Sequence, residues 1–338
     1  MKHILNISNP YELNALFLQP TRWCARNCKG CYAKEHAGGE KGFHLSSWNW
    51  MKLFNMFYLN QAVEEGHRAW ANQITLAVDD LSLDGYQAAE MLNLFGGILT
   101  TVVNRKSNKL DLHPAEFHIT CHTPKTLKNY TFLNKKTPWI SEERTMEMLK
   151  YINMISFSEI PEGEFEFVKE IAKHTPVNYN HLIPANITSD NIDTYVDKVT
   201  KIGRIVSHIY LVMFKRPIGS ETNELVQLRD RSRMLNDIKV IQTLMERLPE
   251  DVRRKVTRDG CLQDVSKHSR TGFGCSSNVS RVQVWPDGSV TGCAYAFGAD
   301  KPQGRTVEIV MENIRNARKE YDFGSLCHLP EIYDSIHK

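Results

Sequence analysis

Short apolar runs alternate with amphipathic stretches along most of this chain. The apolar runs are rich in β-branched and aromatic residues and are bounded by polar residues, proline or glycine, which is typical of β-strands. Because strands that alternate with helices form βαβ units, the pattern indicates an α/β fold with a parallel sheet. The strands are predicted at residues 15–23, 73–81, 116–122, 154–160, 177–184 and 208–217.

Helical periodicity fills segments between the predicted strands. One helix is expected to begin at Ser46 or Ser47, whose hydroxyl can cap a helix N-terminus, and to end at Gly66. Another is expected from Ser189 to Gly203, with apolar residues at i, i+3, i+4 and i+7. Six strand–helix units are too few for a closed eight-stranded barrel. We therefore expect an open, partial (β/α)6 barrel with its chemistry at the carboxyl ends of the strands.

The last part of the chain has a different pattern. A long helical stretch stops at Pro249, and two alternating segments then flank Pro286, Asp287 and Gly288, which predicts a β-hairpin. We therefore expect a boundary near residue 245. It would separate a barrel of residues 1–245 from a small C-terminal α+β domain of residues 246–338.

Composition and charge are those of an ordinary globular protein. Hydrophobic residues make up 41% of the 338 residues, and the net charge of +3 is too small to indicate nucleic-acid binding by itself. No apolar run approaches the roughly 20 residues of a membrane span, and the N-terminal sequence lacks a secretory signal. We expect a cytoplasmic protein whose eight cysteines serve metal or redox chemistry rather than disulfides.

Three cysteines, Cys24, Cys28 and Cys31, follow the first predicted strand in the pattern C-x3-C-x2-C. Three thiolates on so short a loop can each bind one iron of a [4Fe–4S] cluster, which leaves the fourth iron without a protein ligand. An external molecule can then bind that iron. The alternative is a structural zinc site formed by the three cysteines and His36.

In this cysteine motif, and in its position after the first strand, the sequence resembles the radical S-adenosylmethionine (SAM) superfamily. The resemblance implies a partial (β/α)6 radical SAM barrel in which SAM binds the open iron through its amine and carboxylate. It also implies that one electron cleaves the sulfonium C–S bond, and that a 5′-deoxyadenosyl radical then abstracts hydrogen from the substrate. A donor such as flavodoxin or ferredoxin would supply the electron.

Polar residues near the ends of three predicted strands are candidates for binding SAM. By position, the resemblance assigns the SAM amine to Asp79 or Asp80, although a carboxylate there could instead cap a helix. Two pairs share a strand face by alternation: Ser156 with Ser158, and Asn178 with Asn180. Polar pairs are unusual in a buried parallel strand, so we expect both to face the barrel interior. Solvated edge positions are the alternative.

Cys121 is the candidate catalytic side chain. It lies at the end of the third predicted strand, where its thiol could donate a hydrogen atom to a product radical. The alternative is an inert cysteine buried in the core.

A second set of cysteines follows the predicted boundary. Gly288 and Cys293 form a G-x4-C pattern, which resembles the auxiliary-cluster domain of radical SAM enzymes known as SPASM, or its shorter form, twitch. The resemblance implies a second [4Fe–4S] cluster, and a zinc site is the alternative. The four ligands would be Cys261, Cys275, Cys293 and Cys327.

The sequence indicates the chemical class of the substrate but not its identity. Basic residues gather on and after the long helix and could contact phosphates, or they could form a solvated surface. The expected substrate is an amino-acid-derived compound, a nucleotide or a modified nucleic-acid base, and a rearrangement or isomerisation is one form the reaction could take. The alternatives are a peptide-modifying maturase and a non-catalytic zinc-binding interaction protein. The basic residues are Lys215, Arg216, Arg229, Arg231, Arg233, Arg253, Arg254, Lys255 and Arg258.

Overall fold

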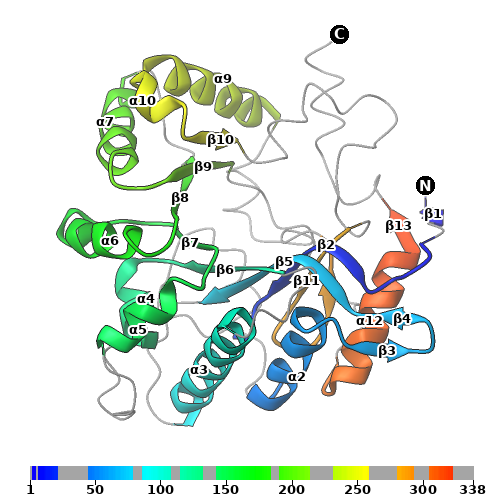
Figure 1. Cartoon of the computed structure of the whole chain (residues 1–338). Helices are drawn as coiled ribbons and strands as arrows, with labels where there is room; N and C mark the ends of the chain where they lie inside the picture. Colours follow the sequence, from blue (N-terminus) through cyan, green and yellow to red (C-terminus); the bar gives the residue numbers. More distant parts are fainter. Residues whose placement is uncertain are drawn as a thin grey trace.

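The centre of the protein is a nine-stranded sheet with the order β10-β9-β8-β7-β6-β5-β2-β11-β12 (Figure 1). The computed structural model describes residues 2–4, 7–21, 45–78, 86–107, 115–131, 142–183, 190–213, 231–258, 280–292 and 304–322. All the predicted strands of the barrel are confirmed, and each pairs in parallel with its neighbours. They are β2 (Glu12–Leu18), β5 (Trp70–Val78), β6 (Glu116–Cys121), β7 (Met154–Phe157), β8 (Val177–Ile183) and β9 (His208–Met213).

Helices lie between these strands in the chain and cover one face of the sheet (Figure 1). Their apolar sides join the sheet in one core, in which the ring of Phe54 packs edge-on against Phe117 of β6 at 5.5 Å between centroids. No helix in the described part of the chain is long and apolar enough to cross a membrane. The helices are α2 (Ser47–Tyr58), α3 (Tyr86–Ser107), α4 (Pro124–Thr131), α5 (Glu142–Leu149), α6 (Phe165–Ala172, preceded by the 3-10 turn Glu162–Glu164) and α7 (Ile192–Gly203).

The two faces of the sheet differ in polarity, and the strand register identifies which residues lie on each face. Residues paired across parallel strands point to the same side. One row runs Leu76, Ile119, Ile155 and Val177, and these apolar residues face the helices. The next row runs Ala77, Thr120, Ser156 and Asn178, on the opposite side. We call this second, more polar side the interior face, because the helices do not cover it.

The first predicted helix is shorter than expected. Ser46 caps its N-terminus through a 3.3 Å bond from the Asn49 amide, as predicted, but α2 ends at Tyr58 rather than at Gly66. Asn60 takes a left-handed backbone conformation with φ of 52°, which stops the helix. The chain then forms a small hairpin of β3 (Ala62–Glu64) and β4 (His67–Arg68), with Gly66 in its turn at φ of 76°.

The C-terminal part of the chain joins the same sheet. The predicted hairpin is confirmed, and its first strand pairs in parallel with β2. Residue 245 lies inside α9, and β10 pairs with β9, so elements on both sides of the expected boundary share one sheet. The division into two domains stays a prediction. The elements are α9 (Arg231–Arg247), α10 (Glu250–Arg253), β10 (Val256–Arg258), β11 (Arg281–Val284), β12 (Val290–Thr291), α12 (Val307–Lys319) and β13 (Glu320–Asp322), which pairs with β1 (Lys2–Ile4).

Candidate functional site

A hydrogen-bonded polar cluster lies on the interior face of β7 and β8. The Asn178 amide nitrogen donates to Ser156 Oγ at 3.1 Å and to Asn180 Oδ1 at 2.7 Å. Ser156 and Asn178 are each 7% exposed. Because Asn178 uses its amide hydrogens on its neighbours, Ser156 can still donate its hydroxyl hydrogen and Asn180 its amide hydrogens. The cluster is therefore suited to bind an acceptor such as a ligand hydroxyl or carboxylate.

Ser158 lies just beyond the end of β7, next to this cluster along the chain. Its amide nitrogen donates to the carbonyl oxygens of Cys121 and His122, at 3.2 and 3.1 Å. This bond ties the carboxyl ends of β6 and β7 together, where the reactions of α/β barrels take place. Ser158 thus stands at the expected edge of the sheet.

The residues predicted to bind the SAM amine and the residues predicted to bind the iron–sulfur clusters lie outside the described part of the chain. In the sequence, Asp79 and Asp80 come directly after Val78, the last residue of β5. Within the described part of the chain, no group of three His, Cys, Asp or Glu side chains could hold a metal ion. The metal ligands predicted from the sequence stay predictions: Cys24, Cys28, Cys31, Cys261, Cys275, Cys293 and Cys327.

Cys121 lies on the wrong side of the sheet for the catalytic role that we considered. Its register partners are Val78 and Phe157, on the helix-covered face. The residue is 1% exposed and belongs to the hydrophobic core. A thiol there cannot reach a substrate on the interior face, so the structure favours the alternative of a buried core cysteine.

Two polar pairs near the carboxyl edge were not found from the sequence. His122 Nε2 lies 3.3 Å from Glu159 Oε2, just past the ends of β6 and β7. Gln283 of β11 donates from Nε2 to Gln19 Oε1 at 3.0 Å, and both amides are buried. His122 directly follows β6 and Glu159 lies two residues after β7, and this closeness to the strand ends was an available signal. The glutamine pair joins residues far apart in the sequence, and only strand pairing reveals it.

A second buried pair lies on the helix-covered face of β8. Tyr179 Oη is 2.9 Å from His181 Nδ1, and His181 is 3% exposed. Burial, together with the charge of Lys198, lowers the pKa of His181 to about 3, so its ring is neutral at pH 7. Burial raises the pKa of Tyr179, and the charge of Glu159 adds to this effect. The pair faces away from the interior face and so has a structural role.

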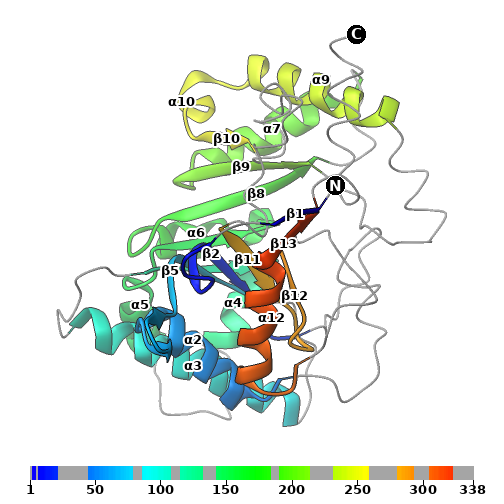
Figure 2. The same ribbon diagram turned by 90° about the vertical axis from the view of Figure 1, so that its right-hand side faces the viewer.

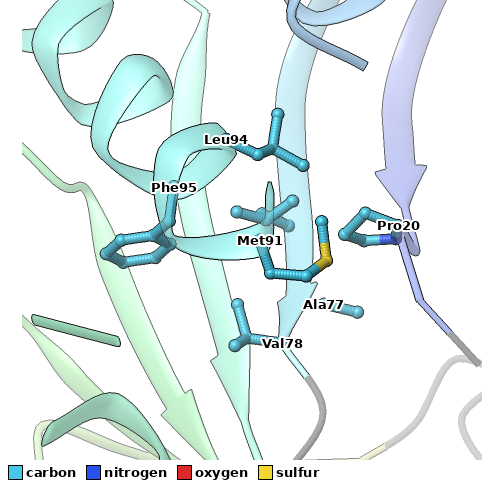
Figure 3. Close-up of a pocket in the computed structure, with 7 residues that line it drawn as sticks. Pro20, Ala77, Val78, Met91, Leu94 and Phe95 are labelled. Carbon is cyan, nitrogen blue, oxygen red and sulfur yellow. The ribbon is translucent and has the colours of Figure 1, made fainter. Parts of the chain in front are cut away.

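An apolar pocket lies between α3 and the carboxyl ends of β2 and β5 (Figure 3). Pro20 comes from the end of β2, and Ala77 and Val78 come from the end of β5. Met91, Leu94 and Phe95 of α3 close the other side. With no polar side chain in its lining, the pocket has no group to orient a polar ligand, and it belongs to the packing of α3 on the sheet.

Two cations of the basic group, Lys255 and Arg254, are engaged within the protein. Lys255 Nζ donates to the carbonyl oxygens of Gly203 and Val206, at 2.8 and 3.0 Å, and so caps the C-terminus of α7. Arg254 pairs with Glu250 within four residues. Cations used in this way are less available to phosphates, which favours the solvated and structural interpretation of this part of the group.

Comparison with known proteins supports the fold. No protein-family model matches the sequence, and no curated protein matches it significantly. Among solved structures, the chain is similar to native anSMEcpe with bound AdoMet and Cp18Cys peptide, at 15% identity and a TM-score of 0.50. The match covers 90% of this chain and 81% of that chain. The similarity is one of fold, and it confirms the predicted α/β fold with a mostly parallel sheet that resembles the radical SAM partial barrel.

Weaker structural matches are found to another protein. A mutant tryptophan synthase α-subunit from the hyperthermophile Pyrococcus furiosus aligns at 10% identity and a TM-score of 0.28. That match covers 77% of this chain and 94% of the other. A similarity of this size carries no argument about function.

Proposed function

We propose that this protein is a radical SAM enzyme that binds a [4Fe–4S] cluster through Cys24, Cys28 and Cys31. The observation that carries the proposal is the position of this motif. The C-x3-C-x2-C pattern begins six residues after Leu18, the last residue of β2, so in the sequence it follows the carboxyl end of that strand. The cluster with bound SAM would supply a 5′-deoxyadenosyl radical. The donor set fits, because three closely spaced thiolates leave one iron open.

The residues of the interior face would bind and orient SAM. Ser156, Asn178 and Asn180 can donate hydrogen bonds to a ribose hydroxyl or to the methionine carboxylate. Asp79 or Asp80 would accept hydrogen bonds from the methionine amine. The apolar core on the other side of the sheet keeps these strands fixed, so the donors are held in place before SAM binds.

The second set of cysteines would hold an auxiliary [4Fe–4S] cluster, with flavodoxin or ferredoxin as the electron donor. The confirmed hairpin of β11 and β12 supports this assignment, because Cys293 lies just past its second strand. Four thiolates are a complete ligand set for a cluster that only transfers electrons. The ligands would be Cys261, Cys275, Cys293 and Cys327.

The reacting part of the substrate is proposed to be neutral and polar, as in a peptide or amino-acid side chain. In the described strands, the interior face carries hydroxyl and amide groups, including Thr75, Thr120 and Ser156, and the imidazoles of His118 and His208 lie in the register rows of Thr75 and Ser156. A peptide occupies the anSMEcpe structure, which adds support. A nucleotide or nucleic-acid base is the second candidate, and an isomerisation remains one form of the reaction. The engagement of Lys255 and Arg254 reduces the support for a nucleic acid.

The decisive experiment is anaerobic reconstitution followed by a product assay. Two clusters predict roughly eight irons per chain, four for each cluster. Incubation with SAM and dithionite should then release 5′-deoxyadenosine. If the purified chain instead binds zinc tightly, takes up no iron and releases no 5′-deoxyadenosine, it is the non-catalytic zinc protein and the proposal is wrong.

Replacing Asn178 by leucine should weaken SAM binding. The substitution removes both hydrogen bonds of the amide and leaves Ser156 and Asn180 without their shared partner. We expect the Kd for SAM, measured by anaerobic equilibrium dialysis on reconstituted protein, to rise about 10- to 100-fold, as for one or two buried hydrogen bonds. Asn72→Leu is the matched control, because Asn72 bonds Asn14 at the exposed amino edge. Equal Kd values for both variants would contradict the assignment.

A further inference from the structure

Two pairs of polar side chains on β5 and β6 have the same arrangement on the interior face. On β5, Gln73 Nε2 donates to Thr75 Oγ1 at 2.9 Å. On β6, Glu116 Oε2 lies 3.1 Å from His118 Nε2. Gln73 is the register partner of Glu116, and Thr75 is the register partner of His118. In each pair, the residue nearer the amino edge of the sheet therefore orients the residue nearer the carboxyl edge.

Thr75 and His118 lie next to the residues proposed to bind SAM. Alternate residues of a strand share a face, so Thr75 faces the same side as Ala77, and His118 faces the same side as Thr120. Thr120 is in register with Ser156. The row of Thr75 and His118 is therefore two residues, or roughly 6.6 Å, from the row of Ser156, toward the amino edge of the interior face.

The His118 ring presents a hydrogen-bond acceptor. Burial lowers the pKa of its imidazole and the charge of Lys106 adds to this effect, while Glu116 acts in the opposite direction, so the ring is neutral at pH 7. A carboxylate only accepts hydrogen bonds, so the hydrogen of the neutral ring is on Nε2, which donates to Glu116. Nδ1 therefore carries a lone pair, and His118 forms no second hydrogen bond with the described residues.

The Thr75 hydroxyl presents a hydrogen-bond donor. Because its oxygen accepts a hydrogen bond from Gln73, its own hydrogen can be donated to another group. Neighbouring strands are about 4.8 Å apart, and Thr75 is directly opposite His118 in the register. A donor and an acceptor therefore lie side by side on this face.

Phe17 of β2 lies on the other side of Thr75. The two residues are register partners, and β2 and β5 lie side by side in both views (Figure 1 and Figure 2). Thr75 is 5% exposed, whereas the His118 side chain is 13% exposed and Phe17 is half-buried. The short threonine thus stands between two larger rings, and a flat group could point its edge at the hydroxyl between them.

One edge of a cis amide is complementary to this row. Such an edge carries a carbonyl acceptor and an N–H donor on the same side of a flat group. The Thr75 hydroxyl can donate to the carbonyl, and His118 Nδ1 can accept from the N–H. An ordinary trans peptide group does not present this edge, because its carbonyl and N–H point in opposite directions. A primary carboxamide and the imide of a pyrimidine base both present it.

We infer that Thr75 and His118 bind a cis-amide edge of the substrate. The inference rests on the proposed function, and it narrows the neutral, polar substrate to one that carries a primary carboxamide or a pyrimidine imide. Gln73 and Glu116 are positioning residues, because they act through Thr75 and His118. Since this row is next to that of Ser156, the bound amide would lie beside the proposed SAM site.

Ligand-observed NMR titrations of the full chain, after anaerobic reconstitution, test the inference with two pairs of probes. Propionamide is compared with N-methylpropionamide, in which the trans amide places the methyl group beside the carbonyl oxygen. Thymidine is compared with N3-methylthymidine, which lacks the imide hydrogen. In one pair, the unmethylated probe should bind about 5- to 10-fold tighter, as for one buried hydrogen bond. The propionamide pair identifies a carboxamide substrate, and the thymidine pair identifies a pyrimidine.

Variants assign the preference to the two side chains. His118→Ala should abolish it, because the substitution removes the acceptor and gives the methyl group room. Thr75→Val should weaken both probes of the pair about 5- to 10-fold and keep their ratio, because it removes only the donor to the carbonyl. Thr75→Ser is the matched control, since it keeps the hydroxyl and should bind as the wild type does.

Circular dichroism establishes that each variant is folded. Should His118→Ala fail to fold, the comparison of Thr75→Val with Thr75→Ser replaces it. Equal affinities within both probe pairs in the wild type, or an unchanged preference in His118→Ala, would overturn the inference. So would equal affinities in Thr75→Val and Thr75→Ser. The titrations need no turnover, so a wild-type protein that releases no 5′-deoxyadenosine would overturn the proposed function while they still judge the amide site.

Discussion

Replacement of Cys24, Cys28 and Cys31 by serine is expected to abolish the formation of 5′-deoxyadenosine from SAM. Serine hydroxyls are hard, weakly acidic ligands and do not replace thiolates on iron–sulfur clusters. Bound iron should fall from roughly eight to roughly four per chain, because the auxiliary ligands remain. The measurements are iron content after anaerobic reconstitution and quantification of 5′-deoxyadenosine with dithionite as reductant.

Cys121→Ala is the matched control for this triple variant. Cys121 is buried on the helix-covered face, so the substitution removes a thiol without touching the interior face. The variant should keep its iron and its 5′-deoxyadenosine formation, with a small loss of stability from the cavity. Product formation by the triple variant, or its loss in Cys121→Ala, would show that the ligands are assigned wrongly.

His181 should make the protein less stable as the pH falls. Its pKa is about 3 in the folded state, against an ordinary value of 6.5 that applies to the unfolded chain. Between these pH values the unfolded chain binds a proton that the folded protein excludes. The free energy of unfolding should therefore fall by about 1.4 kcal/mol for each pH unit below 6.5, and His181 should add no slope above it.

The measurement is urea denaturation of wild type and His181→Gln at pH 7, 6 and 5. Glutamine can still accept the hydrogen bond of Tyr179 but does not titrate in this range. In the variant, the free energy of unfolding should therefore lose the pH dependence that His181 contributes. His174→Gln is the control, because its imidazole is a third exposed. Parallel stability curves for wild type and His181→Gln would contradict the buried, neutral histidine.

The alternation of residue types predicted most of the barrel. Every predicted barrel strand is present, because a buried parallel strand needs a continuous run of apolar and β-branched residues. The two-residue period also predicted that Ser156 and Asn178 face the interior, and strand register brings them to 3.1 Å of each other. Local periodicity was sufficient here because it determines side-chain direction within a strand.

The end of α2 could not be predicted in the same way. The apolar pattern continues past Tyr58, and only the left-handed backbone at Asn60 diverts the chain into the β3–β4 hairpin. A tertiary contact stabilises that hairpin, because Glu64 pairs with Arg315 of α12; within the hairpin, the Ala69 amide donates to the Gln61 carbonyl. A helix boundary set by a distant helix leaves no signal in its own sequence.

The sequence by itself determined the order of strands and helices, the faces of β7 and β8, and the spacing of the cysteines. These depend on interactions over a few residues, where backbone geometry dictates which side chains lie together. Only the tertiary structure decided that β11 lies beside β2, that Gln283 meets Gln19, and that Cys121 belongs to the core. Contacts between residues more than 250 positions apart result from the packing of the whole sheet, and no local pattern encodes them.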